Sequence, residues 1–155
     1  MGDPGACAVS RRILVIHGSK RDVFQQTDSV VTSDVTLEHI DEEMRKTAAA
    51  CGMEVDTFQS EDEKELARRI KEASEAYNVM VIDLEGHASK GVTIREALSG
   101  LDIPIIEVHV ANAHAKANLG QNSLIGDKVT AQLAGFGKRG YVMAVGASAN
   151  LAPKA

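Results

Sequence analysis

Histidine and carboxylate side chains recur in this sequence at the points where apolar runs end. Four of the five histidines stand there, namely His17, His87, His109 and His114. A free imidazole titrates at roughly pH 6.5, so each of them can donate or accept a proton at neutral pH. Further polar side chains accompany them: Asp83, Glu85, Ser89, Lys90 and Asn112. This pattern predicts acid-base chemistry.

The apolar runs themselves predict strands. Aliphatic stretches typical of strands buried on both faces occur at 12–17, 79–84 and 104–109, with shorter candidates at 54–58 and 129–134. Helical spacing of apolar residues predicts helices over 36–51, from Ser60 through Tyr77, and over 92–98. Ser60 and Glu63 have the spacing of a capping box that would open the second helix. A last apolar segment covers 140–145, and the polar stretch 20–34 is typical of a long loop that acts as a lid.

Strands that alternate with helices form parallel sheets with helices on both faces. We therefore expect an α/β fold, in which ligands bind beyond the carboxyl ends of the strands. His17, Asp83 and His109 would each lie at the end of a strand and would meet at that edge. Glu107 is expected to form a structural ion pair or a subunit contact, and Arg95 is expected to have a structural role inside its helix.

Composition limits the class of protein. The 155 residues, 44% hydrophobic and 25% charged, suit a single globular domain, expected over 12–150 after a disordered tail at 1–11. A net charge of −5 and an aromatic content of 3% argue against nucleic acid and anionic membranes as partners, and favour a small molecule. No apolar stretch approaches the roughly 20 residues that span a bilayer, and Cys7 and Cys51 have no paired spacing. We expect a reduced, cytoplasmic protein.

Motifs for bound cofactors are missing. The sequence has no phosphate-binding loop of the Walker type, no dinucleotide fingerprint after the first strand and no nucleophile elbow. A metal site made of His17, His87, His109 and Asp83 is chemically possible, because imidazole and carboxylate suit zinc or iron, but no recognised ligand spacing supports it. We therefore expect no cofactor and no metal.

Several short motifs between Arg12 and Val145 form a consistent set. They include 13–18, 94–98, 102–104 and 137–141, and the most specific is E-V-H-x-x-N-x-H-A at 107–115. Together they resemble the type II 3-dehydroquinate dehydratases over nearly the whole chain. The resemblance implies a flavodoxin-like three-layer sandwich with a five-stranded parallel sheet. A homotrimer that is usually assembled into a dodecamer is implied as well. It also implies cofactor-free elimination of water from a small molecule through an enolate.

The resemblance assigns roles to individual residues. In that family the histidine of E-V-H is the general acid that protonates the departing hydroxyl, and His109 matches it. Asn112 matches an asparagine that helps to hold the substrate carboxylate. The substrate-binding positions implied are His17, Lys20, Ser89, Val110, Ala111, Asn112 and Gly120, and the implied lid positions are Arg21, Phe24, Thr27 and Thr32.

Some positions depart from the family pattern. The arginine and tyrosine that form the enolate-generating base fall at Thr27 and Thr32, and 20–34 contains no tyrosine. Threonine hydroxyls do not ionise near neutral pH, so the ordinary proton abstraction should be lost. Asp83, Glu85 and His87 are new titratable groups at the same edge, and Asp83 or Glu85 is the expected partner of His109, because partial burial tunes the basicity of a carboxylate.

The resulting hypothesis is a dehydroquinase-like lyase with an altered active site. It would use His109, Asp83, Glu85 and His87 for elimination, cyclisation or isomerisation of a cyclic or carbonyl compound other than 3-dehydroquinate. Two alternatives stay open. One is a working 3-dehydroquinate dehydratase with a different base, and the other is a catalytically retired scaffold or binding protein.

Overall fold

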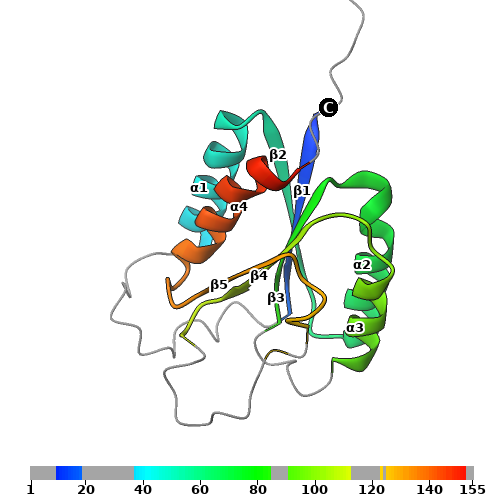
Figure 1. The fold of residues 1–155 in the computed structure, drawn as a ribbon. Coiled ribbons are helices and arrows are strands. Elements are labelled where there is room, and N and C mark those ends of the chain that lie inside the picture. The colour runs from blue at the N-terminus through cyan, green and yellow to red at the C-terminus, as the bar shows by residue number, and fades with distance from the viewer. Residues whose placement is uncertain (1–9, 19–36, 85–90, 113–122, 124, 153–155) are drawn as a thin grey trace, which may run out of the picture.

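The sheet contains all the predicted strands. A computed structural model of the chain describes residues 10–18, 37–84, 91–112, 123 and 125–152. Within these residues five parallel strands lie in the order β2-β1-β3-β4-β5 (Figure 1). Their bounds are β1 (Arg11–His17), β2 (Met53–Gln59), β3 (Val79–Asp83), β4 (Ile105–His109) and β5 (Ala131–Ala134). The predicted α/β class and five-stranded parallel sheet are confirmed.

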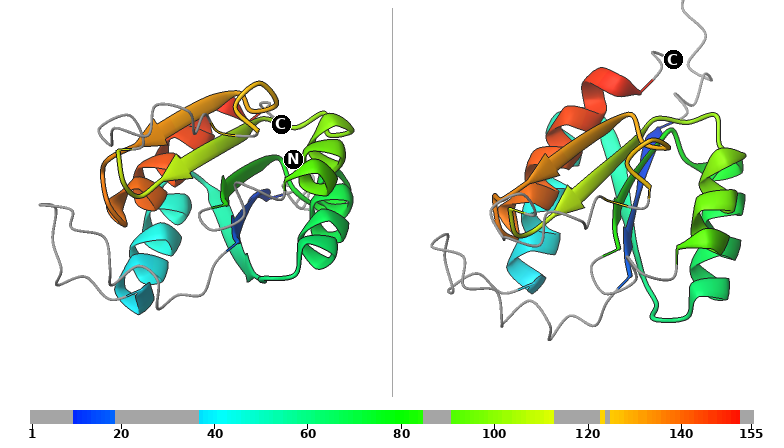
Figure 2. Two further views of the ribbon diagram at one scale, coloured as in Figure 1. Left: turned by 90° about the horizontal axis from the view of Figure 1, so that it is seen from below. Right: turned by 60° about the horizontal axis from the view of Figure 1, so that its bottom comes forward.

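Helices cover both faces of this sheet. The helices α1 (Leu37–Ala50) and α4 (Arg139–Leu151) pack on one face, and α2 (Glu63–Ala76) and α3 (Val92–Ser99) pack on the other. Two further views show the sheet between these two helix layers (Figure 2). One buried apolar cluster lies under each pair of helices. This is the expected flavodoxin-like three-layer sandwich.

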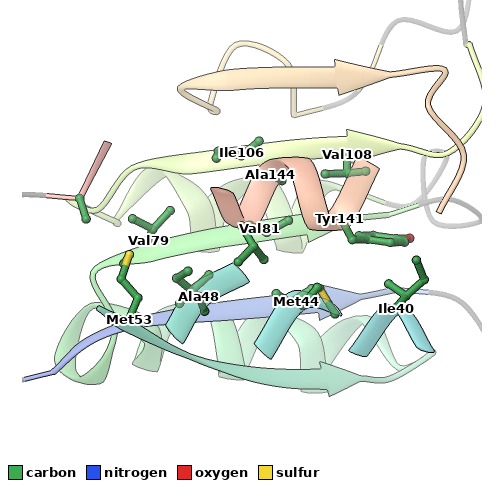
Figure 3. Close-up of a cluster of buried hydrophobic side chains, with 14 of the residues drawn as sticks. Ile40, Met44, Ala48, Met53, Val79, Val81, Ile106, Val108, Tyr141 and Ala144 are labelled. Carbon is green, nitrogen blue, oxygen red and sulfur yellow. The ribbon is translucent and has the colours of Figure 1, made fainter. Parts of the chain in front are cut away.

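The central strand β1 shows how side chains are divided between the two layers. Ile13 and Val15 pack in the α1/α4 cluster, whereas Leu14 and Ile16 pack in the α2/α3 cluster, and all of them are fully buried. Alternate side chains of a strand point to opposite faces, so a central strand needs apolar residues at every position. Figure 3 shows the α1/α4 cluster, with Tyr141 lying near the carboxyl ends of the strands. The same alternation determines on which of the two faces each strand-end side chain lies.

Helix α2 begins differently from the prediction. Asp62 is its N-cap, and the Asp62 carboxylate accepts a hydrogen bond from the Lys64 backbone N–H at 2.9 Å. The Ser60 hydroxyl donates instead to the Glu65 carboxylate at 2.6 Å, so the predicted capping box of Ser60 with Glu63 is wrong. Serine and aspartate are both good N-caps, and the spacing alone did not distinguish them.

The apolar segment predicted at 140–145 is the start of α4. Gly140, Ala144 and Ser148 are buried at intervals of four residues and form the face toward the sheet. A Cβ atom on Gly140 would lie 3.2 Å from Val108 Cγ1, so the missing side chain lets the helix approach β4 closely. Small residues at this spacing therefore hold α4 against the strands that carry the candidate site.

The predicted domain bounds at 12 and 150, and the tail at 1–11, stay predictions, since residues 1–9 lie outside the described part of the chain. None of the helices described is both long enough and apolar enough to cross a membrane.

Candidate active site

Three predicted residues lie at the carboxyl edge of the sheet. His17, Asp83 and His109 are the last residues of β1, β3 and β4. His17 and Asp83 are register partners, and the Gly18 backbone N–H donates to the Asp83 carbonyl at 2.8 Å. The structure therefore places all three where ligands of parallel sheets bind.

The three side chains do not share one face of the sheet. Val81 of β3 packs in the α1/α4 cluster, so Asp83, two residues later, faces α1 and α4. Ile105 of β4 packs in the α2/α3 cluster, so Glu107 and His109 face the opposite side. Asp83 and His109 consequently belong to two separate networks.

The first network, called here the His109 network, consists of His109, Glu107, Ser123 and Gln132. The His109 Nε2 atom lies 3.0 Å from Glu107 Oε1. The Ser123 hydroxyl donates to the same Glu107 oxygen, and Gln132 Nε2 donates to Glu107 Oε2 at 2.7 Å. The His109 side chain is 22% exposed and the Glu107 side chain only 2%, so the carboxylate lies beneath an imidazole that solvent reaches.

Glu107 is held in its charged form. Burial by itself would raise the pKa of this carboxyl group, but hydrogen bonds from His109, Ser123 and Gln132 outweigh burial and lower its pKa below the ordinary value. A carboxylate that stays ionised favours the protonated imidazole beside it. The arrangement can therefore present a proton at the sheet edge, as a general acid requires.

This arrangement corrects one prediction. Asp83 or Glu85 is the expected carboxylate partner of His109, but the structure brings Glu107 against His109, while Asp83 faces the other side of the sheet. Glu85 lies outside the described residues, so its pairing stays a prediction. The physical reason is the two-residue repeat of a strand, which puts positions 107 and 109 on one face. The ion pair expected for Glu107 is present, and it lies inside the candidate site.

The second network, the Tyr141 network, consists of Tyr141, Asp83 and His17. The Tyr141 hydroxyl donates to Asp83 Oδ2. The His17 ring lies edge-on to the Tyr141 ring, with centroids 4.9 Å apart and an interplanar angle of 73°. The three residues are nearly inaccessible, with exposures of 4% for His17, 1% for Asp83 and 0% for Tyr141. They join α4 to the ends of β1 and β3.

The three residues that follow β4, 110–112, differ in how deeply their side chains are buried. The Val110 side chain is 1% exposed within the α1/α4 cluster, and its carbonyl accepts from the Gly137 backbone N–H at 2.9 Å. The Val110 side chain therefore packs in the core, and the predicted part of Val110 in substrate binding stays a prediction. Ala111 is half-buried and Asn112 is exposed. A Cβ atom on Gly135, whose φ is +88°, would lie 3.2 Å from Asn112 Cβ, so glycine is needed beside Asn112.

The remaining predicted site residues lie outside the described part of the chain: Lys20, Glu85, His87, Ser89, Lys90, His114 and Gly120, with the lid residues Arg21, Phe24, Thr27 and Thr32. Their roles stay predictions, as do the roles assigned to His17, Asp83, His109, Ala111 and Asn112. Among the residues that the structure describes, no group of three or more histidine, cysteine, aspartate or glutamate side chains is arranged to hold a metal.

Sequence reasoning missed three members of the two networks. Gln132 reaches Glu107 because β5 pairs with β4, with the two residues in register, and Ser123 reaches Glu107 from the segment before β5. Tyr141 carried a weak signal, because a tyrosine in an apolar segment needs a partner for its hydroxyl once it is buried. The Arg95 guanidinium binds the Asp127 carboxylate, and the structural role expected for Arg95 stays a prediction.

Comparisons with known proteins place the chain in one family. The family model described as dehydroquinase class II matches residues 11–149. The catabolic 3-dehydroquinase 1 of Fusarium vanettenii is 34% identical over 133 residues, which cover 86% of this chain and 92% of that protein. The 3-dehydroquinate dehydratase of Leptothrix cholodnii is 35% identical over 140 residues, covering 90% and 94%.

A solved structure gives the same result. The type II dehydroquinase from Propionibacterium acnes superposes with a TM-score of 0.77 at 25% identity, covering 91% of this chain and 99% of that chain. The chain belongs to the class II dehydroquinase family. The predicted family is confirmed, and with it the lyase class of the expected enzyme.

Proposed function

We propose that this protein is a lyase that uses His109 as a general acid on a small carbonyl compound, without a cofactor. The observation that carries the proposal is the ion pair of His109 with Glu107 at the end of β4. The imidazole is partly exposed, its carboxylate partner is buried and ionised, and both lie at the sheet edge where ligands bind.

The chemistry follows from this pair. A base removes the proton next to the substrate carbonyl, and the electron pair moves to the carbonyl oxygen to give an enolate. When the enolate collapses, the bond to the departing hydroxyl breaks, and the proton of His109 converts that hydroxyl to water. Glu107 stabilises the imidazolium before the transfer. Cyclisation or isomerisation through the same enolate would use His109 in the same way.

The substrate that we propose is a cyclic or carbonyl compound other than 3-dehydroquinate. The chain has two tyrosines, and neither lies in the segment 20–34 where the family carries its tyrosine base. Tyr141 is buried and donates to Asp83. Tyr77 is the C-cap residue of α2, just before β3 begins, where burial and its hydrogen bond to Asp56 raise its pKa. Both tyrosines therefore donate hydrogen bonds to aspartates, and neither occupies a position within 20–34.

The second candidate is 3-dehydroquinate dehydratase activity with a different base. It is favoured by the names of relatives such as those of Fusarium vanettenii and Leptothrix cholodnii, which match most of the chain. Asp83, Glu85 and His87 are the proposed bases for either activity.

One assay separates the two candidates. The purified protein is mixed with 3-dehydroquinate, and the ultraviolet absorbance of the conjugated enone product is followed. We expect no growth of the signal above the rate without protein. Rapid growth at low protein concentration would contradict our proposal and support the second candidate.

The substrate itself is sought by thermal shift. Cyclic ketones and polyketide-like compounds are screened for a rise in the melting temperature, and stabilising compounds are then tested for turnover. If some compounds stabilise the protein but none of them is converted, the result would favour a binding protein that has lost catalytic activity.

We further propose that the chain assembles as a homotrimer, either alone or as the building block of a dodecamer, and acts in the cytoplasm. Light scattering after size-exclusion chromatography measures the assembly, and a mass of a single chain would contradict it.

A further inference from the structure

We propose that Ser123 and Gln132 are positioning residues that act on His109 through Glu107. The consequence for catalysis rests on the proposed function, whereas the contacts of Ser123 and Gln132 with Glu107 do not depend on it. Glu107 accepts from the Ser123 hydroxyl at one carboxylate oxygen and from Gln132 at the other, while His109 shares the oxygen that Ser123 binds.

The Ser123 hydroxyl is itself oriented. Its oxygen accepts a hydrogen bond from the Ile125 backbone N–H at 3.2 Å, and its proton goes to Glu107. A serine hydroxyl has one proton to donate, so this backbone contact leaves that proton for the carboxylate. Ser123 is thereby fixed as a donor to the Glu107 oxygen that faces His109.

Gln132 reaches the other oxygen of Glu107 from the neighbouring strand. The two residues are register partners of β5 and β4, and Gln132 Nε2 lies 2.7 Å from Glu107 Oε2. A Cβ atom on Gly126 would lie 3.1 Å from Gln132 Nε2, so the absence of a side chain there leaves room for the amide group. Together Ser123 and Gln132 prevent the carboxylate from rotating away from His109.

The turn that follows Ser123 is anchored to the rest of the fold. The Lys128 backbone N–H donates to the Ile125 carbonyl at 2.8 Å, and the Ile125 side chain is 1% exposed within the α2/α3 cluster. The Asp127 carboxylate accepts from both terminal nitrogens of Arg95 on α3. Bidentate pairs of this kind fix orientation as well as distance. Helix α3 therefore supports the position of Ser123.

The proposal predicts a change in how Glu107 binds protons. Each hydrogen bond to the carboxylate favours its charged form, so removing one of them should raise the pH at which Glu107 titrates. A hydrogen bond to a charged group is strong enough to shift this midpoint by about one pH unit. A residue that served only to support the fold would change stability but leave this midpoint where it is.

The test compares the full-length wild type with Ser123→Ala and Gln132→Leu. Glutamate is isotope-labelled in its carboxyl group, and the Glu107 signal is identified by its loss in Glu107→Gln. We expect the Glu107 midpoint to rise by about one pH unit in each variant. The matched control is Ser99→Ala, because the Ser99 hydroxyl donates to the Arg95 carbonyl within α3 and does not touch Glu107. This control should leave the midpoint unchanged.

Two outcomes overturn the proposal: an unchanged midpoint in both folded variants, or an equal rise in Ser99→Ala. Two different variants keep the test decisive if one of them fails to fold. The titration uses no substrate, so it is independent of the proposed lyase activity. A raised midpoint in a protein that converts no compound would support the positioning network and contradict the proposed function alone.

Discussion

The two networks at the sheet edge are similar in composition and different in setting. Each joins a histidine, a carboxylate and a hydroxyl group: His109 with Glu107 and Ser123, and His17 with Asp83 and Tyr141. In the His109 network the histidine is partly exposed and lies above its carboxylate, whereas the members of the Tyr141 network are nearly inaccessible. A strand-end position therefore does not by itself give a side chain access to solvent, because the face of the sheet and the packing around it also decide its exposure.

This difference assigns separate tasks to the two networks. A partly exposed imidazole on an ionised carboxylate can pass a proton to a ligand. A fully buried tyrosine that binds a buried carboxylate instead ties α4 to β3 and satisfies both polar groups. We therefore infer that His109 serves proton transfer and that the Tyr141 side chain serves stability, and the following changes test that division.

The largest effect is expected for His109→Ala, on the turnover rate of any compound that the wild type converts. Loss of a general acid should lower kcat by about a hundredfold to ten-thousandfold. Steady-state kinetics measure it, with His39→Ala as the control because His39 is an exposed residue of α1. Retention of the full rate would remove His109 from the mechanism.

Truncation of Tyr141 should have the largest effect on folding. Tyr141→Ala empties a fully buried position, and comparable aromatic truncations lower the free energy of unfolding by about 3–5 kcal/mol. Urea denaturation followed by circular dichroism measures this loss. His109→Ala should cost far less in the same experiment, and equal losses would break the division between the networks.

Removal of the Tyr141 hydroxyl alone should have an intermediate effect. Tyr141→Phe keeps the ring but leaves the buried Asp83 carboxylate without this donor, at a cost of about 1–3 kcal/mol. The same urea titration measures it, and a stability equal to that of the wild type would show that the Tyr141 hydroxyl does not support the fold.

The smallest effect is a pH dependence of stability that comes from Glu107. Its pKa is lower in the folded protein than the ordinary value of 4.5, so its stabilisation is fully present above that value and is lost as the pH falls through the lower folded-state pKa. The stability difference between wild type and Glu107→Gln, about 1 kcal/mol, should shrink as the pH falls below about 4.5. Urea titrations at several pH values measure it, with the exposed Glu54→Gln as control. A difference that stays constant at low pH would contradict the assignment.

The sequence was sufficient for much of the fold. Strands such as β1 and β3 are unbroken aliphatic runs, and their end residues His17 and Asp83 follow directly from them. The start of α2 was less certain, because Ser60 and Asp62 are both suitable N-caps. For α4 the sequence predicts only an apolar segment at 140–145 and not a helix, because its small residues indicate close packing and not a particular type of secondary structure.

The candidate site was harder to predict because its contacts are distant along the chain. Ser123 and Gln132 lie 16 and 25 residues from Glu107, and Tyr141 lies 58 residues from Asp83. These pairs depend on strand order and on helix packing, which periodicity does not specify. The pairing of Glu107 with His109 was accessible from strand alternation alone.

The central claim is that Glu107, and not Asp83, is the carboxylate that acts on His109. Heteronuclear NMR measures it most directly, by following the His109 imidazole against pH in the wild type, Glu107→Gln and Asp83→Asn. The His109 signal is identified by its absence in His109→Ala. Loss of the adjacent negative charge in Glu107→Gln should lower the titration midpoint of His109 by about one pH unit or more, and Asp83→Asn should leave it near the wild-type value. A midpoint that falls in Asp83→Asn and not in Glu107→Gln would contradict the account.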